Sequence, residues 1–268
     1  SVPEIEALAL AVNAVMNTAA NASPQATAAH FATLGIAGVH ADNLAAVLAA
    51  LQATNDDGSG ARTQAQLQAL VDSVNARLLG IIAQYAQANS GTAPTAADYA
   101  RAGISGVDSV NIFAVNSALA SAAVTGTSVD TVAKAQTVVD SFRTILAEAN
   151  GLTADATPAQ DPTAQDYLNI GATRAGALDA LGLALLNDVI GDLPFYAVDS
   201  VSEIEALANT VGKIMALAND QTPAASLTLQ DMQALGITGV TSGQLQVFTA
   251  MLQTPGVTAA NADSLRSE

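Results

Sequence analysis

Two histidines are the residues of this sequence best suited to metal binding or proton transfer. His30 and His40 lie in one stretch of the chain, and aspartates, Asp98 and Asp108, occupy the corresponding positions 68 residues later. A metal or catalytic site would need a third ligand or a partner that recurs with the imidazoles, and the sequence offers none. We therefore predict that both histidines are surface or helix-capping residues, with no metal site around them.

An acidic loop at Asp56 and Asp57 suggests calcium chemistry, because glycine follows the two carboxylates. With Gly58 at the sixth position of an EF-hand loop, the first and twelfth positions would be Ala53 and Gln64. Both positions require oxygen ligands, usually carboxylates, so the motif fails. We predict a turn, keep Asp56 and Asp57 as weak calcium candidates, and expect no other cofactor.

Paired carboxylates could serve as general acid and base, and two pairs occur: Glu4 with Glu6, and Glu203 with Glu205. On a helix, residues two apart point to different faces, so neither pair can share a substrate. The chain has no Cys, and its many Ser and Thr residues lack a Gly-x-Ser-x-Gly elbow. The sequence therefore predicts a protein that is not an enzyme.

The composition excludes several classes of partner. The 268 residues include 24 acidic and 8 basic side chains, for a net charge of −16. Such a chain lacks the positive charge needed to bind nucleic acid or an anionic membrane surface. No apolar run reaches the roughly 18 residues of a membrane span, so we expect no membrane insertion. Half of the residues are hydrophobic but only 3% are aromatic, which favours closely packed helices.

The elements that would position any site become visible when the sequence is compared with itself. Four similar segments each open with a threonine and close with a glycine, and the glycines are spaced by 68, 68 and 65 residues. A threonine at the N-cap accepts from the N3 amide, while an acid at N3 bonds back; His30 replaces that acid in the first copy. Glycine at C′ ends a helix in a left-handed conformation. The predicted structural caps are Thr27, Thr95, Thr163 and Thr228, and Gly35, Gly103, Gly171 and Gly236.

Two further helices accompany each short capped helix, since apolar residues recur there at three and four positions. One follows it, at residues 42–51, 109–119, 177–186 and 242–252. A longer one precedes it, seen at residues 4–8, 66–85, 132–149 and 203–207. We predict an all-α tandem array of four three-helix repeat units of about 67 residues. The predicted units are residues 1–61, 62–127, 128–199 and 200–268.

One register of the short helices carries large side chains: Phe31, Tyr99, Tyr167 and Met232. An aromatic row can form a binding ladder, but matching positions inside a short helix favour the anchor of each core. Units of this size have marginal cores, and docking to neighbours should stabilise them. The spacing leaves open whether the units are separate beads or share helices.

Three motifs carry a resemblance to a known family. They read Asp-Tyr-Ala-x-x-Gly-Ile-x-Gly-Val at 98–107, Asn-x-x-Ala-Val-Asn-x-Ala-Leu at 111–119, and Gln-x-Val-Val-Asp-Ser at 136–141. The pattern resembles the Ala-rich helical tandem repeats of large secreted bacterial surface adhesins of the biofilm and repeats-in-toxin type. Their helical modules are similar to the albumin-binding GA module. The resemblance covers nearly the whole chain, although residues 172–175 depart from Ile-x-Gly-Val in the third copy.

This resemblance implies a secreted protein of the bacterial cell surface and a role in cell adhesion and biofilms. The first hypothesis is a non-catalytic structural spacer that extends a distal binding region from the cell. The alternative is a repeat binding module that presents a helix face to a host or matrix protein. Expected partners are the neighbouring repeats of a longer chain and, in the alternative, that host or matrix protein. The family motif is structural, so it assigns no binding residues here.

Overall fold

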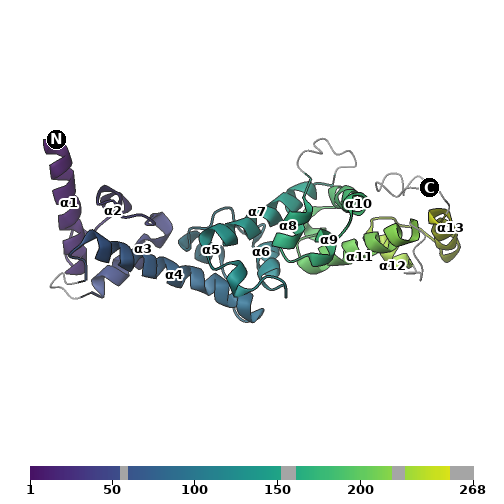
Figure 1. Ribbon diagram of the computed structural model, residues 1–268, viewed down its shortest axis with the longest axis horizontal. Coiled ribbons are helices and arrows are strands. Elements are labelled where there is room, and N and C mark those ends of the chain that lie inside the picture. Colours follow the sequence, from purple (N-terminus) through teal and green to yellow (C-terminus); the bar gives the residue numbers. More distant parts are fainter. Residues whose placement is uncertain (55–59, 152–160, 219–226, 254–268) are drawn as a thin grey trace.

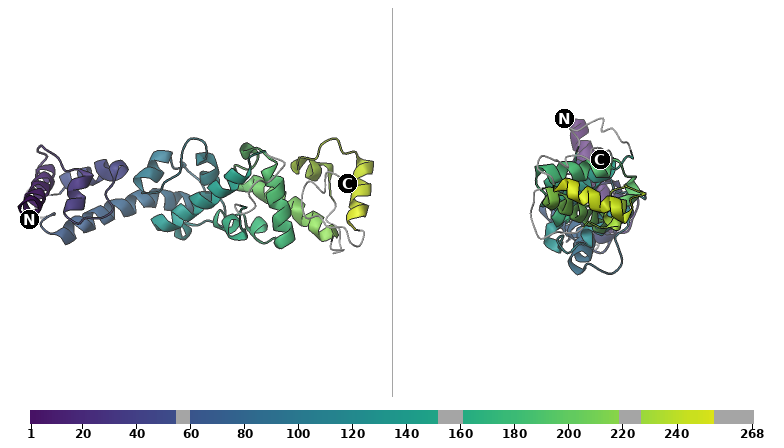
Figure 2. Two further views of the ribbon diagram at one scale, coloured as in Figure 1. Left: turned by 90° about the horizontal axis from the view of Figure 1, so that it is seen from above. Right: turned by 90° about the vertical axis from the view of Figure 1, so that its right-hand side faces the viewer.

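The structure is a computed structural model that describes residues 1–54, 60–151, 161–218 and 227–253. Over these ranges the chain is all-α: it forms α-helices and short 3₁₀ turns and no β-strand, apart from an isolated bridge between Asn150 and Pro194. The molecule is elongated, with α1 (Val2–Ala19) at one end and α13 (Ser242–Leu252) at the other (Figure 1). The view from above shows the same extended arrangement (Figure 2).

The helices fall into three groups by length and position. Long helices are α1, α4 (Gln64–Ala88), α7 (Val132–Glu148) and α11 (Val201–Ala218). Six-residue helices are α2 (Ala28–Thr33), α5 (Ala96–Arg101), α8 (Ala164–Asn169) and α12 (Leu229–Ala234). The third group is α3 (Ala41–Gln52), α6 (Ile112–Leu119), α10 (Ala180–Gly191) and α13. Three shorter elements complete the described fold: η1 (Gly126–Ser128), α9 (Thr173–Gly176) and η3 (Phe195–Ala197).

Two predicted helix bounds are wrong. The helix predicted at 109–119 begins only at Ile112, and residues 109–111 form a turn in which Asp108 Oδ1 accepts from the Val110 and Asn111 amides at 2.8 and 3.2 Å. The helix predicted at 177–186 is replaced by α9 and α10. Asp179 caps α10 through the Gly182 amide at 2.8 Å, so this helix starts later and continues to Gly191.

Each internal long helix packs on elements both before and after it in the sequence. α4 contacts α3 on one side and α5 and α6 on the other. α7 contacts α6, then α8 and α10, and α11 contacts α6, α9 and α10, then α12 and α13. We call the packing of a long helix on the helices that precede it a joint. The long helices are therefore shared across the joints, and no separate three-helix beads are seen in the described chain.

Sharing of helices gives the molecule one continuous hydrophobic core. A single cluster of buried side chains extends from Ala14 in α1 to Leu252 in α13. It is built largely from Val, Leu, Ile and Ala, with few aromatic rings, so the helices approach closely. No helix of the described residues is both long enough and apolar enough to cross a membrane.

Candidate functional site

The structure places all four predicted threonines at the N-caps of the six-residue helices. The hydroxyl oxygens of Thr27, Thr95, Thr163 and Thr228 accept from the amide three residues later at 3.1–3.4 Å. Side chains at that third position return a bond to the threonine amide: Asp98, Asp166 and Asp231 through a carboxylate oxygen at 2.8–2.9 Å, and His30 through Nδ1 at 3.1 Å. Each short helix thus satisfies amides that its own backbone leaves unpaired.

The four predicted glycines end the same helices. Gly35, Gly103, Gly171 and Gly236 have φ between +71° and +84°, the left-handed region that glycine adopts without strain. In every copy the glycine amide bonds to the carbonyl three residues back, and the next amide bonds to the carbonyl five residues back, at 2.8–3.0 Å. These paired bonds define a Schellman motif, which fixes the direction in which the chain leaves each short helix.

The candidate chemical groups are not brought together into a site. His30 caps α2, and His40 lies at the N-cap of α3, where its amide donates to Asn43 Oδ1 at 2.8 Å. Glu4 pairs with the N-terminal amine at 2.7 Å, whereas Glu6 is exposed. Within the ranges described, no group of three or more His, Asp or Glu residues is placed to hold a metal ion. The calcium candidates Asp56 and Asp57 lie outside the described residues.

The row of large side chains forms the centre of each short helix. Phe31, Tyr99, Tyr167 and Met232 are at most 2% exposed. Tyr99 and Tyr167 also donate to asparagines of a later helix, to Asn116 Oδ1 of α6 and Asn187 Oδ1 of α10 at 2.7 Å each. Burial raises the pKa of both phenols, so each remains a hydrogen-bond donor at neutral pH. The row is therefore buried in the core and offers no exposed ladder to a ligand.

A polar contact that the sequence did not reveal recurs at the joints. At the first joint, Gln68 of α4 accepts from the Ala37 amide at 2.9 Å and donates to the Ala37 carbonyl at 3.2 Å. At the second, Gln136 of α7 makes the same pair of bonds with Ser105, at 2.9 and 3.1 Å. In each case the amide nitrogen also donates to an aspartate four residues on, which holds the side chain in place. We call this contact the joint clamp.

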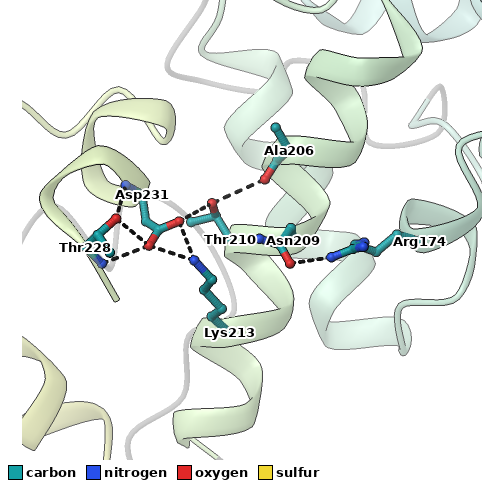
Figure 3. Close-up of polar contacts among 7 residues, drawn as sticks. All are labelled: Arg174, Ala206, Asn209, Thr210, Lys213, Thr228 and Asp231. Atoms are coloured by element: carbon teal, nitrogen blue, oxygen red, sulfur yellow. Dashed lines mark hydrogen bonds and ion pairs between the residues drawn. The ribbon is translucent and has the colours of Figure 1, made fainter. Parts of the chain in front are cut away.

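The third joint carries a charged version of the joint clamp. Glu205 of α11 accepts from the Arg174 amide at 2.7 Å and pairs with the Arg174 guanidinium at 3.4 Å. Asn209, four residues later, accepts from that guanidinium (Figure 3). All three clamps join residues 31 apart: Ala37 with Gln68, Ser105 with Gln136, and Arg174 with Glu205. This constant separation, together with the Gln/Glu-x-x-x-Asp/Asn spacing, was the signal available in the sequence.

The last short helix carries the most elaborate cap. Asp231 accepts from Lys213 Nζ at 2.8 and 2.9 Å and from the Thr210 hydroxyl at 3.1 Å, in addition to its bonds with Thr228 (Figure 3). Burial disfavours its charged form, but the bonds from Lys213 and Thr228 outweigh burial and lower the pKa of Asp231. This carboxylate is therefore ionised at neutral pH and fastens α12 to α11.

A groove of about 470 Å³ lies beside this cap. It lies between α12 and α13, and its lining includes Met232, Ile237, Val240 and Phe248. Grooves of about 300 and 340 Å³ lie beside α7 and between α1 and α4. None of the described residues that line the groove between α12 and α13 is titratable, so its chemistry is that of an apolar contact surface.

Comparison with known proteins identifies no relative of this chain. The chain matches no protein-family model, no curated protein and no solved structure.

Proposed function

We propose that this chain is a non-catalytic spacer: the repeat region of a secreted bacterial cell-surface adhesin, which holds a distal binding region away from the cell. In this proposal the chain is an array of four repeat units, at residues 1–61, 62–127, 128–199 and 200–268, joined through shared long helices. Its partners are the neighbouring repeats. The resemblance of its motifs to adhesin repeats motivates the cell-surface location.

The observation that carries the proposal is the linear order of the joints. Helices follow one another along the long axis from α1 to α13 (Figure 2), and each of α4, α7 and α11 packs on the helix that comes before it. The joint clamps bond a side chain to backbone groups, so each fixes both the position and the angle of the next long helix. In an array, such nearest-neighbour contacts add stability and stiffness along the whole length.

Small-angle X-ray scattering of the intact chain tests the proposal. A compact protein of this length has a radius of gyration of about 18 Å, whereas four units in line give on the order of 30 Å or more. The large value is expected, and the small value would overturn the spacer. Gln136→Ala should broaden the distribution of interatomic distances by loosening the middle joint. Gln84→Ala, at an exposed position of α4, is the matched control and should leave the scattering unchanged.

The alternative function, a module that binds a host or matrix protein, is favoured by one surface feature. Val110, in the turn before α6, and Phe113, in its first turn, are 65% and 63% exposed and lie three residues apart. Serum albumin is the first probe, because GA modules bind it. Saturable binding of albumin to the immobilised chain, abolished by Phe113→Ser, would favour the binding module. Retention of binding in Phe113→Ser would exclude this surface.

A further inference from the structure

Two turns inside the array share a backbone conformation but differ in the charges beside it. Each joins a helix of the third group to the next long helix: η1 leads from α6 into α7, and η3 leads from α10 into α11. The residue after each turn is a buried valine, with φ −135° and ψ 24° at Val129 and φ −137° and ψ 23° at Val198. An offset of 69 residues therefore aligns the two turns residue by residue.

The first of these turns holds an ammonium group that the chain itself supplies. Lys134, in the first turn of α7, donates from Nζ to Asp130 Oδ1 at 2.7 Å and to the Thr127 carbonyl at 3.0 Å. The aspartate comes directly before the N-cap residue, Thr131, and the lysine is the third residue of the helix. One carboxylate and one backbone carbonyl of this turn thus bind a single ammonium group.

The second turn keeps this arrangement but replaces the lysine by an acid. The three positions that form the ammonium contact correspond here to Tyr196, Asp199 and Glu203. Burial, and then the neighbouring carboxylate of Glu203, raise the pKa of Asp199. Over the described ranges, no lysine or arginine forms an ion pair with either carboxylate. The second turn therefore brings two acidic groups together at the position where the first turn has a cation.

The second turn also carries two exposed aromatic rings, where the first turn has Gly126 and Thr127. Phe195 is 42% exposed and Tyr196 is 66% exposed, and their rings meet edge to face with centroids 5.9 Å apart. The face of an exposed ring attracts a cation, and aromatic side chains are enriched at protein interfaces. The rings and the two carboxylates lie within one short stretch of chain, so a single cationic side chain can contact both.

We propose that the turn at η3 is a docking surface for a lysine side chain of a partner protein. The ammonium group of the partner takes the place that Lys134 Nζ has at η1, and it pairs with Asp199 and Glu203. Two carboxylates and a backbone carbonyl match the three donors of an ammonium group, whereas a guanidinium presents a planar fork. The net charge of −16 favours the approach of a basic partner. This surface does not depend on the joints, so the proposal is independent of the spacer function.

Fluorescence anisotropy of a labelled tetralysine peptide, titrated with the intact chain at physiological ionic strength, tests this inference. The parent chain should bind the peptide saturably. Glu203→Lys supplies the ammonium group from the chain, as Lys134 does in α7, and should weaken binding about tenfold or more. The start of α7 shows that a long helix accepts lysine at this position. Glu6→Lys is the matched control, because it changes the net charge equally at an exposed position of α1, and it should weaken binding less than about twofold.

Two substitutions of Tyr196 test the surface without altering the N-cap of α11. Tyr196→Thr installs the residue of the first turn and removes the ring, so it should weaken binding about two- to fivefold. Tyr196→Phe keeps a ring and should bind like the parent chain. Absence of binding to the parent chain, or equal binding to Glu203→Lys, would overturn the proposal. Displacement of the peptide by calcium but not by free lysine would assign the two carboxylates to a metal ion and would also overturn it.

Discussion

The inner and outer short helices share their ends but differ at their centres. All four begin with a capping threonine and end in a Schellman glycine. The inner pair, α5 and α8, is centred on Tyr99 and Tyr167, whose hydroxyls bond to asparagines that in turn donate to the Pro94 and Pro162 carbonyls at 2.9 Å. The outer pair has Phe31 and Met232 at the same position, with no polar atom that could make such a bond.

This difference distinguishes interactions within one short helix from interactions that depend on the neighbouring helices. The caps involve residues within a few positions of one another, so every copy needs them to stop and start a six-residue helix. The central side chain fills a space set by a later helix. Its polarity varies with the hydrogen-bonding groups which that helix presents to it. In α5 and α8 the tyrosine links three segments of chain, whereas in α2 and α12 packing alone holds the centre.

Removing a central ring should have the largest effect. Tyr167 is fully buried, so Tyr167→Ala leaves a cavity and an unpaired asparagine, and should lower the free energy of unfolding by about 3–5 kcal/mol. Urea denaturation followed by circular dichroism measures the loss. Leu168→Ala is the control within the same helix; its side chain is 43% exposed, so it should cost less than about 1 kcal/mol. Equal losses would contradict the assignment of Tyr167 as the anchor.

Two glycines separate backbone strain from crowding: Gly171, which ends α8, and Gly239, which lies three residues after the glycine that ends α12. Gly171 and Gly239 both have φ near +80°, so an alanine at either position is strained by about 1–2 kcal/mol. A methyl group at Gly171 would also collide with Ser121 and Val124, whereas Gly239 has open space around it. Gly171→Ala should therefore lower the free energy of unfolding by about 1 kcal/mol or more beyond the loss caused by Gly239→Ala. Thermal or urea unfolding measures both losses. A larger loss at Gly239 would show that crowding does not matter at Gly171.

The sequence predicted the parts of the fold that depend on short-range spacing. Thr95 and Gly103 lie at the two ends of one short helix, and their chemistry alone places the cap and the stop. Repetition at 68 residues then extends the prediction to the other copies. The buried position of Tyr99 followed in the same way, because a side chain at one register of every copy points to one common environment.

The parts that failed or were missed depend on contacts across longer distances. Gln68 reads as a surface residue until the loop at Ala37 is brought against it, and nothing within α4 requires that partner. Likewise the bond from Tyr167 to Asn187 needs α10 in place. The start of α6 was misplaced for a separate reason: residues 109–111 form a turn ahead of the helix, and apolar periodicity does not register it.

Removing only the phenol oxygen sharpens the comparison between α5 and α8. Tyr167→Phe leaves Asn187 Oδ1 without its donor in a site where the asparagine is 4% exposed, so the loss should be about 1–2 kcal/mol. Tyr99→Phe should cost less, because water reaches the half-buried Asn116 and can replace the hydroxyl. Urea midpoints of the two variants provide the measurement. Equal costs would mean that the deeper burial of Asn187 does not make its bond from Tyr167 more important than the bond from Tyr99 to Asn116.

The acidic caps give the smallest effect, and pH separates them. The pKa of Asp231 is lowered in the folded chain, so its contribution is present above the unfolded pKa of about 3.9 and is lost as pH falls through the lower folded value. Near neutral pH, Asp231→Asn should lower stability by about 1 kcal/mol, and this penalty should shrink in acid. Hydrogen exchange of the α12 amides measures it. Asp98 is the control, because its pKa is lowered mainly by hydrogen bonds from Thr95 and its cationic neighbour is the exposed Arg101 rather than a half-buried lysine. Asp98→Asn should show a smaller penalty in α5 with the same direction of pH dependence. If the Asp231→Asn penalty did not change with pH, the charge on Asp231 would have no part in fastening α12 to Lys213.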